Sequence, residues 1–446
     1  MSSVPDPRLD ALRALAERDD LRAFVEGASH YHPSDLADVL AALPEGTRVR
    51  AVAELPPELA SAALAEMETG EHPEEILLAV GPDYAAELVE ELPSDDAADI
   101  VGELAPDERE AVLAEVEDRA DVERLLTYPE ESAGGLMTTD VVAVDQDATL
   151  GEAIVEIRRQ SGEEDEPYDV YVVDRGQRLV GTIPIARLVV LPSDRHVRDI
   201  MRPPAATVRP EQDQEQVARV MARYNIAAVP VVDAAERLIG RITFDDVIDV
   251  VEAEMTEDLL KFGGVNPHEE LGASWRGAVR SRLPWTLVNL MTAFFGASVV
   301  YLFRDTLSRV VLLAVWMPII AGMGGNAGTQ ALAVTVRRLA LKQLPRGRAA
   351  QVIRKEMLVG LVNGLAVGAV VAVLAGTLGG ARLLGLVVLL AMWGNLVVGG
   401  FAGAFIPLVL ERLGADPAVA SSMFVTAFTD TCGFLLLLGL GAVVLL

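Results

Sequence analysis

One acidic residue lies in the middle of an apolar stretch near the end of the chain. Asp430 follows Phe424-Val-Thr-Ala-Phe-Thr and precedes Thr-Cys-Gly-Phe-Leu-Leu-Leu-Leu. A charged side chain at the centre of a membrane-spanning helix costs about 2.5–3.5 kcal/mol on insertion scales, so it is usually kept for an ion path, a proton relay or a paired counter-charge. The charged residues of the C-terminal third fall at expected helix ends, which leaves Asp430 without a partner. The pattern indicates a cation pathway.

Neutral side chains with oxygens that can coordinate a cation occur at helical spacing near this aspartate and in a second apolar segment. Thr426 and Asp430 are four residues apart, as are Asn326 and Gln330, so each pair shares one helix face. Mg²⁺ binds through few carboxylates and keeps several waters, because it dehydrates reluctantly and requires octahedral oxygen. We therefore expect a site for a hydrated divalent cation formed by Asp430, Asn326, Thr426 and Gln330.

Charge divides the chain into three parts. Residues 1–133 carry 34 acidic and 9 basic residues, residues 134–270 carry 27 and 14, and residues 271–446 carry 5 and 14. This asymmetry indicates two acidic soluble parts followed by a membrane part. The acidic surface argues against nucleic-acid binding and is compatible with cation binding, although most of these carboxylates are explained by ordinary solvation. The single cysteine, Cys432, excludes a disulfide framework within the chain.

Five apolar segments predict a membrane domain over residues 271–446. They span about 284–303, 309–336, 352–378, 382–410 and 418–446, and each is long enough to cross a hydrocarbon core of about 30 Å. Seven basic residues between positions 337 and 355 place the loop between the second and third segments in the cytosol. Since residues 1–20 also lack the apolar core of a signal peptide, we expect a multi-pass protein of the cell (inner) membrane. Its N-terminus is then cytoplasmic and its C-terminus extracytoplasmic.

Residues 1–133 predict an all-α superhelical domain. The phrases Asp35-Leu-Ala-Asp-Val-Leu-Ala-Ala-Leu-Pro, Ala86-Glu-Leu-Val-Glu-Glu-Leu-Pro and Ala98-Asp-Ile-Val-Gly-Glu-Leu-Ala-Pro repeat an amphipathic helix period. A proline followed by acids then opens the next helix, and Ser94 is placed to cap one of them. The chain's five histidines show no metal-ligand spacing, so we expect them on the surface or in the core.

Residues 134–248 contain an internal duplication. The strand pattern ending at Asp174 and the following Leu179-Val-Gly181 return as Asp233 and Leu238-Ile-Gly240, both with an offset of 59 residues. The repeat resembles a tandem CBS pair, an α+β module used mainly as an intracellular regulatory sensor, over residues 134–197 and 198–248. In other CBS pairs adenine nucleotides bind, and the second copy keeps the Thr243-x-x-Asp246 pattern that would hold ribose. The first copy has no equivalent aspartate, so ATP binding stays an open alternative.

An acidic linker helix is expected over residues 249–270. Its carboxylates recur at intervals of three and four residues and include Asp249, Glu254, Glu257 and Asp258. We expect these residues, together with Asp246 and with Asp95 and Asp99 of the N-terminal domain, to bind regulatory Mg²⁺. For each of them a solvated helix face is an equally good explanation.

The whole chain resembles the MgtE family of magnesium channels. Pro318-Ile-Ile-Ala-Gly-Met-Gly-Gly-Asn-Ala-Gly-Thr-Gln330 is similar to the family's second-helix signature, and the segment from Asp416-Pro417 through Asp430 to Gly433 to its fifth-helix signature. The resemblance implies a homodimer with one pore on the two-fold axis, a plug helix between sensor and gate, and Asp430 as the ion site. It implies a transporter and no enzyme. Transport of Mn²⁺ or Co²⁺, or a proton-coupled carrier, remains the alternative.

Overall fold

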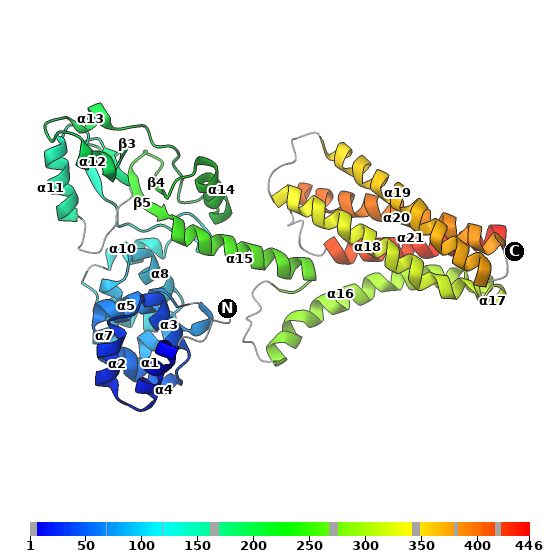
Figure 1. The fold of residues 1–446 in the computed structure, drawn as a ribbon, viewed down its shortest axis with the longest axis horizontal. Coiled ribbons are helices and arrows are strands. Elements are labelled where there is room, and N and C mark those ends of the chain that lie inside the picture. The colour runs from blue at the N-terminus through cyan, green and yellow to red at the C-terminus, as the bar shows by residue number, and fades with distance from the viewer. Residues whose placement is uncertain are drawn as a thin grey trace. The chain divides into compact units, whose positions relative to one another are not determined.

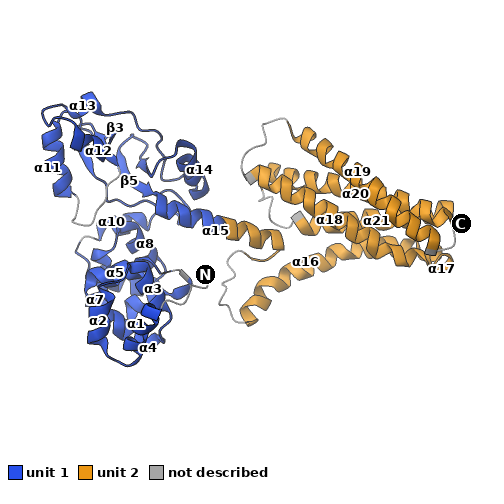
Figure 2. Ribbon diagram, in the orientation of Figure 1, with its two compact units in different colours: residues 1–254 blue, residues 255–446 orange. Residues whose placement is uncertain are grey.

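The computed structural model describes residues 7–67, 69–117, 119–160, 169–266, 275–340, 348–378, 382–414 and 421–446. These residues form two compact units, residues 1–254 and 255–446, which Figure 2 distinguishes by colour. Each unit is described by itself. The first contains short helices and small sheets, and the second contains long helices (Figure 1).

The N-terminal half of the first unit is helical. Prolines open several of the helices, at Pro33, Pro57, Pro73, Pro82 and Pro106, because a first-turn residue needs no amide donor and the fixed φ of proline suits a helix start. The expected amphipathic phrases lie on α3, α7 and α8, which confirms their helical interpretation. The elements are α1 (Pro7–Glu17), α2 (Leu21–Ala28), α3 (Pro33–Ala41), α4 (Glu45–Glu54), α5 (Pro57–Ala65), η1 (Thr69–Glu71), α6 (Pro73–Ala79), α7 (Pro82–Glu91), α8 (Ser94–Gly102), α9 (Pro106–Leu113) and α10 (Ala120–Leu125).

Ser94 does not cap its helix. Pro93 occupies the cap position, and the Ser94 hydroxyl instead lies 3.1 Å from Thr138 Oγ1 and accepts the Thr139 amide at 2.9 Å. The Ser94 amide donates to Asp140 Oδ2 at 3.3 Å. This buried network joins α8 to the start of the duplicated region, so the expectation of a capping role is wrong.

The duplicated region forms two related α/β halves. In the first half, β1 (Ala143–Asp145) pairs parallel with β2 (Asp169–Val173), which pairs antiparallel with β3 (Leu179–Pro184). In the second half, β4 (Ala228–Val232) pairs antiparallel with β5 (Leu238–Thr243), and a single parallel bridge from Val208 to Val231 takes the place of β1. The connecting helices are α11 (Leu150–Gln160), α12 (Ile185–Val190), α13 (Val197–Ile200) and α14 (Gln214–Tyr224).

The two halves exchange contacts reciprocally through their glycines. Gly181 packs against Met201 and the Arg202 carbonyl that open the second half, and Gly240 packs against Met137 and the Thr138 carbonyl that open the first. A side chain at either position would collide with this backbone, so the offset of 59 residues corresponds to one repeated close approach. Each half therefore completes the other.

Helix α15 (Phe244–Gly263) leaves the second half as one 20-residue helix. It begins inside the segment expected to be the second CBS repeat and extends through most of the expected linker. Residues 267–270 of that linker lie outside the described residues. The end of α15 belongs to the second unit, where Phe262 packs near Leu332, Ala402 and Val425 and its carbonyl accepts the Ser422 hydroxyl at 3.2 Å.

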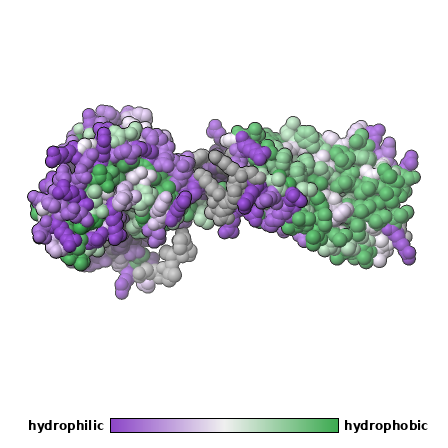
Figure 3. Space-filling view, turned by 90° about the horizontal axis from the view of Figure 1, so that it is seen from above, coloured by the Kyte–Doolittle hydropathy of each residue, from purple (hydrophilic) through white to green (hydrophobic). Residues whose placement is uncertain are grey.

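The second unit consists of long helices with a largely hydrophobic surface and polar groups towards its ends (Figure 3). Four of them, in the described residues, are long and apolar enough to cross a membrane. Helix α18 is also 28 residues long but less apolar, because it contains glycines and two amides; it is the expected second segment. The helices are α16 (Trp275–Leu302), α17 (Arg304–Arg309), α18 (Leu313–Ala340), α19 (Ala349–Leu378), α20 (Arg382–Arg412) and α21 (Ser421–Val444).

Helix α20 is the central element of this unit. One of its faces is buried along almost the whole helix, and its glycines admit the backbones of neighbours. A Cβ atom on Gly403 would overlap the Gly328 carbonyl of α18 and lie 2.8 Å from the Ala331 Cβ. The buried Asn395 donates its amide to the Ile320 carbonyl at 2.8 Å, which pins α20 to α18 by a hydrogen bond as well. This packing fixes the position of α18.

Gly403→Ala should destabilise the second unit by about 1–3 kcal/mol, the usual cost of overpacking, because backbone atoms of α18 cannot move aside like a flexible side chain. Thermal unfolding of the purified protein in detergent measures the effect. Gly376→Ala on α19 is the matched control, since a Cβ there meets nothing within 4 Å. Equal melting temperatures for the two variants would contradict the packing described here.

Candidate functional site

Helix α18 carries a row of exposed residues on one face. Gly322, Asn326 and Gln330 are spaced by four residues and are all exposed, whereas Gly324 and Gly328 on the opposite side are buried against α20 and α21. We call the three exposed residues the α18 polar stripe. Amides facing lipid hydrocarbon are unfavourable, so such a stripe in a membrane segment normally faces water or another protein surface.

Helix α21 packs against α18 and presents the predicted aspartate. Gly328 approaches Val425 Cγ1 so closely that a Cβ on this glycine would lie 2.5 Å from it. One turn further on, Asp430 is partly exposed, and its carboxylate has no hydrogen bond or ion pair to any described residue. Thr426, on the same face, is exposed and donates to the Ser422 carbonyl at 2.9 Å, which leaves its oxygen lone pairs available.

The structure thus places all four predicted pore residues on exposed faces of two adjacent helices. Among the described residues, no hydrogen bond joins Asp430 to Asn326 or Gln330. The arrangement offers one carboxylate with neutral oxygens on neighbouring helix faces. An unpaired carboxylate beside hydroxyl and amide oxygens suits a hydrated divalent cation better than an anion or an organic substrate.

A second acidic site lies in the first unit, between α8 and the start of α15. We define the acidic cluster as Asp95, Asp96 and Asp99 of α8 with Asp246 of α15. Burial raises the pKa of Asp95 well above its usual range, and the neighbouring Asp96 and Asp246 raise it further. Burial, followed by the charge of Asp246 and other carboxylates, raises the pKa of Asp96 to about 7.

The remaining members behave in the same way. Burial raises the pKa of Asp99 to about 7, with further contributions from Asp95, Glu130 and Asp246. Burial also raises the pKa of Asp246, although its hydrogen bonds from Thr243 oppose the change. Asp95 is only 9% exposed, and its Oδ1 has no hydrogen-bond partner in the part of the chain that the structure describes. A buried oxygen that has no hydrogen-bond partner and lies among like charges is suited to coordinate a cation.

Sequence reasoning identified three of these four carboxylates and missed Asp96. Asp96 lies three residues before Asp99, and this spacing was a signal that could have indicated it. Asp249 lies at the edge of the cluster, where burial raises its pKa, followed by the charges of Asp245, Glu252 and Glu66. Glu66 also raises the pKa of Asp96, so these two carboxylates have a common acidic neighbour.

The other predicted regulatory residues lie further along α15. Glu254 accepts a hydrogen bond from Gln214 Nε2 at 2.9 Å, and Glu257 pairs with Lys261 on its own helix. Glu257 and Asp258 belong to the second unit. The structure therefore brings Asp95, Asp99 and Asp246 together and does not add Glu254, Glu257 and Asp258 to the same cluster.

Thr243 and Asp246, which the sequence proposes for nucleotide binding, are bonded to each other. Asp246 Oδ2 accepts the Thr243 hydroxyl at 2.7 Å and the Thr243 amide at 3.1 Å. The bond from the Thr243 amide is one half of a capping box at the start of α15. Asp246 thus contributes one oxygen to the helix cap while it faces the acidic cluster.

One histidine has neighbours that the spacing argument overlooked. His72, Glu74 and Glu75 bring possible ligand atoms within 4.8 Å of one another, and His72 Nδ1 lies 3.0 Å from Glu74 Oε1. The group is at the first turn of α6, where acidic side chains are favourable for the helix itself. The favourable position of Glu74 and Glu75 in the first turn explains the arrangement, although His72 makes no side-chain capping hydrogen bond.

The long apolar helices, the exposed polar faces of α18 and α21, and the duplicated α/β region define a class: a membrane transporter with a soluble regulatory part. Family models agree in all three regions. A divalent cation transporter model named MgtE matches residues 317–440, an MgtE intracellular N domain matches 31–131, and CBS domains match 133–192 and 197–253. The chain belongs to the MgtE family.

Individual relatives give the same assignment. The chain is 38% identical to "Magnesium transporter MgtE" of Thermus thermophilus over 337 residues, and the aligned region covers 73% of each protein. It is 36% identical over 320 residues to the protein of the same name from Enterococcus faecalis, covering 72% of this chain and 70% of that one. A crystal structure of the cytosolic domain of the Mg²⁺ channel MgtE in complex with ATP aligns with a TM-score of 0.51 at 35% identity, covering 54% of this chain and 99% of that one.

The acidic cluster predicts an inverse dependence of stability on pH. Asp96 and Asp99 have folded pKa values of about 7 against an ordinary value of 3.8, so the folded state holds protons that the unfolded state releases. Their stabilising contribution is complete below about pH 4 and is lost as the pH rises to 7. Asp96, which is partly buried, contributes about 1.4 kcal/mol per pKa unit, and Asp99 contributes less because its side chain is exposed and solvent screens its charge. In chelator, a fragment of residues 1–263 should therefore melt several degrees lower at pH 8 than at pH 5.

The control is the double variant Asp96→Asn/Asp99→Asn. It should flatten this pH dependence, because neither amide titrates, and it should reduce the stabilisation that Mg²⁺ gives at pH 8. Scanning calorimetry at both pH values, with and without Mg²⁺, provides the measurement. A wild-type fragment that melts higher at pH 8 than at pH 5 in chelator would show that the ionised aspartates of the cluster do not destabilise the folded state.

Proposed function

We propose that this protein is a Mg²⁺-selective channel or transporter, driven by the membrane potential and closed by cytosolic Mg²⁺ that binds its soluble part. One observation carries the transport part of the proposal. Asp430 is a carboxylate without a protein partner among the described residues, partly exposed on the apolar helix α21, which packs against α18. The names of the relatives, which are magnesium transporters, support Mg²⁺ as the ion.

The pore requires a second copy of the chain. Within one protomer Asn326 of α18 and Thr426 of α21 are exposed, and Asp430 of α21 is partly exposed. Two copies related by a two-fold axis would bring these faces together and would supply two carboxylates to one hydrated ion. A homodimer with the ion site on its axis therefore removes polar groups from lipid and forms the pathway in one step.

The driving force is the membrane potential. A potential of about 100 mV is worth about 4.6 kcal/mol for a divalent cation, which accumulates the ion on the order of a thousandfold. This holds with both soluble regions in the cytosol, as the basic residues flanking α18 and α19 favour. The N-terminus is then cytoplasmic and the C-terminus extracytoplasmic, in the cell (inner) membrane. Because an open pore would overload the cell, such a protein needs a cytosolic brake.

The acidic cluster is suited to be this brake. Mg²⁺ is coordinated by carboxylate oxygens, and Oδ1 of the buried Asp95, which has no hydrogen-bond partner among the described residues, could serve as such a ligand. An ion there offsets the mutual repulsion of Asp95, Asp96, Asp99 and Asp246 and favours the docked arrangement of α8 on α15. At low Mg²⁺ these charges repel and the two elements separate. Asp249, Glu254, Glu257 and Asp258 extend the same acidic surface along α15.

Nucleotide binding is the less supported part of the proposal. The cytosolic domain of the relative whose structure contains ATP supports an adenine nucleotide at the CBS pair, with Thr243 and Asp246 on the ribose. In this chain the Thr243 hydroxyl is engaged with Asp246, so a nucleotide would have to compete with the cap of α15. Among ions, Mn²⁺ and Co²⁺ have similar ligand preferences and are the alternative substrates, and a proton-coupled carrier is the alternative mechanism.

Asp430→Ala should abolish Mg²⁺ uptake without unfolding the protein, because it removes the charge that attracts the ion and also a costly intramembrane charge. Asp430→Asn keeps the size and should lose the attraction as well. The measurement is Mg²⁺ flux into proteoliposomes under an imposed potential, with size-exclusion chromatography as the test of folding. Wild-type flux in either variant would show that Asp430 is not the ion site.

The brake is tested with the variant Asp249→Asn/Glu254→Gln/Glu257→Gln/Asp258→Asn. If the variant mainly loses the Mg²⁺ ions that bridge carboxylates, the channel stays open. If it mainly loses the repulsion between carboxylates, the channel stays closed. We expect weakened inhibition, since neutral side chains cannot replace carboxylates as ligands. Current is recorded against cytosolic Mg²⁺, and the matched control is Glu110→Gln/Glu115→Gln/Glu117→Gln/Glu123→Gln, which removes equal charge from another face of the soluble part. An unchanged inhibition midpoint in the α15 variant would place the sensor in the α8 carboxylates instead.

A further inference from the structure

Helix α19 has two unlike faces. Gly360, Gly364 and Gly368 lie against the backbone or Cβ atoms of α20, and this face is buried. The opposite face is exposed in the protomer, with Leu358, Val359 and Val362 exposed by 61%, 43% and 63%. Helix α19 is therefore a peripheral helix whose outer face requires a partner from outside the protomer.

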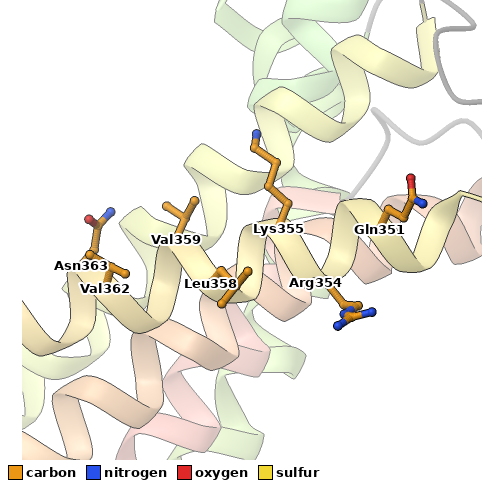
Figure 4. A pocket seen from close by; sticks show the side chains of 7 residues that line it. All are labelled: Gln351, Arg354, Lys355, Leu358, Val359, Val362 and Asn363. Carbon is orange, nitrogen blue, oxygen red and sulfur yellow. The ribbon is translucent and has the colours of Figure 1, made fainter.

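The outer face contains an open groove of about 620 Å³. Two ridges of side chains at a spacing of four residues border it, as expected for the surface of a helix. Figure 4 shows Gln351, Lys355, Val359 and Asn363 projecting from one edge of the helix and Arg354 and Leu358 from the other. Polar and basic residues thus border the groove at its N-terminal end, and apolar residues follow.

The position of the groove along the helix corresponds to the membrane boundary. Helix α19 has 30 residues, and after Glu356 it continues for 22 residues without a charged side chain. At 1.5 Å per residue this apolar part is about 33 Å long, close to the thickness of the hydrocarbon core. Arg354 and Lys355 then lie at the headgroup level, and Leu358 to Val362 lie in the first turns of the hydrocarbon.

The charge of the groove is positive. Lys355 Nζ lies 3.1 Å from Glu356 Oε1, and the buried Glu356 side chain is only 7% exposed, so this lysine balances an internal carboxylate. Arg354 is exposed and has no acidic partner among the described residues. Its guanidinium is left to attract an anion from outside, and its planar donors suit a phosphate group.

We propose that this groove binds an anionic phospholipid. The phosphate lies against Arg354 and Lys355, with Gln351 as a further donor, and one acyl chain follows the apolar part of the groove between the two ridges. The inference rests on the proposed orientation of the chain, which places the groove in the cytoplasmic leaflet, where basic residues meet anionic headgroups.

The test is lipid retention by the full-length protein. Delipidated protein is incubated with equal amounts of phosphatidylglycerol and phosphatidylcholine that carry identical acyl chains, and bound lipid is counted by native mass spectrometry. Wild type should retain phosphatidylglycerol at least about tenfold better. Arg354→Gln/Lys355→Gln should remove that preference. The matched control, Arg337→Gln/Arg338→Gln at the end of α18, loses the same charge and should keep it.

Three results would overturn the proposal. They are equal retention of the two lipids by wild type, retention of neither, and an equal loss of preference in the control variant, which would indicate general electrostatics. A second copy of the chain is the competing occupant. It is tested by oxidative cross-linking of Val359→Cys in a Cys432→Ser background in membranes: a cross-linked dimer would assign the groove to the protein partner. None of these readouts depends on ion flux, so they fail independently of the proposed transport function.

Discussion

Carboxylates without a cationic partner are the constraint on which both ends of this molecule depend. In the first unit, Asp96, Asp99 and Asp246 gather around the buried Asp95 without an ion pair to a lysine or arginine among the described residues, and the pKa values of all four rise accordingly. In the second, Asp430 is partly exposed on an apolar helix without a partner in the described residues. Both arrangements are unfavourable for the chain alone and would be relieved by a bound cation. Under the proposed function, the same physical cost produces an ion site in one unit and a sensor for that ion in the other.

The close packing of small residues makes these sites possible. Gly328 and Gly403 let α18 and α20 touch along their backbones, and the buried Asn395 bonds the Ile320 carbonyl. Because these contacts occupy one side of α18, the polar side chains of Asn326 and Gln330 are left on the other. The direction of the stripe is therefore a consequence of glycine packing and requires no contact by the amides themselves.

Much of this was readable from the sequence. The helical period and the duplicated strands are local signals, so they predicted the three regions. The charge at Asp430 is a local signal as well, and the pore role that it indicates stays a prediction. What the sequence could not show depended on distant neighbours. Asp96 differs from many exposed aspartates only by its burial between α8 and α15, and Ser94 has the sequence of a cap but bonds to Thr138, 44 residues away. The sequence likewise could not separate Asp246, which meets the carboxylates of α8, from Glu254, Glu257 and Asp258, because all four lie on one acidic helix.

The reciprocal contact of the CBS halves has a consequence for the order of synthesis. Thr138 exchanges backbone hydrogen bonds with Arg241, 103 residues later, and Thr138 is also the partner through which Ser94 joins α8 to the duplicated region. At about 5–20 residues per second, a ribosome needs roughly 5–20 s to produce that stretch. The surface around Thr138 that binds α8 is therefore incomplete until the second CBS half has been synthesised. Asp246 follows Arg241 by only a few residues. Translation thus keeps Asp246 apart from the three aspartates of α8 until the framework that must hold them together exists.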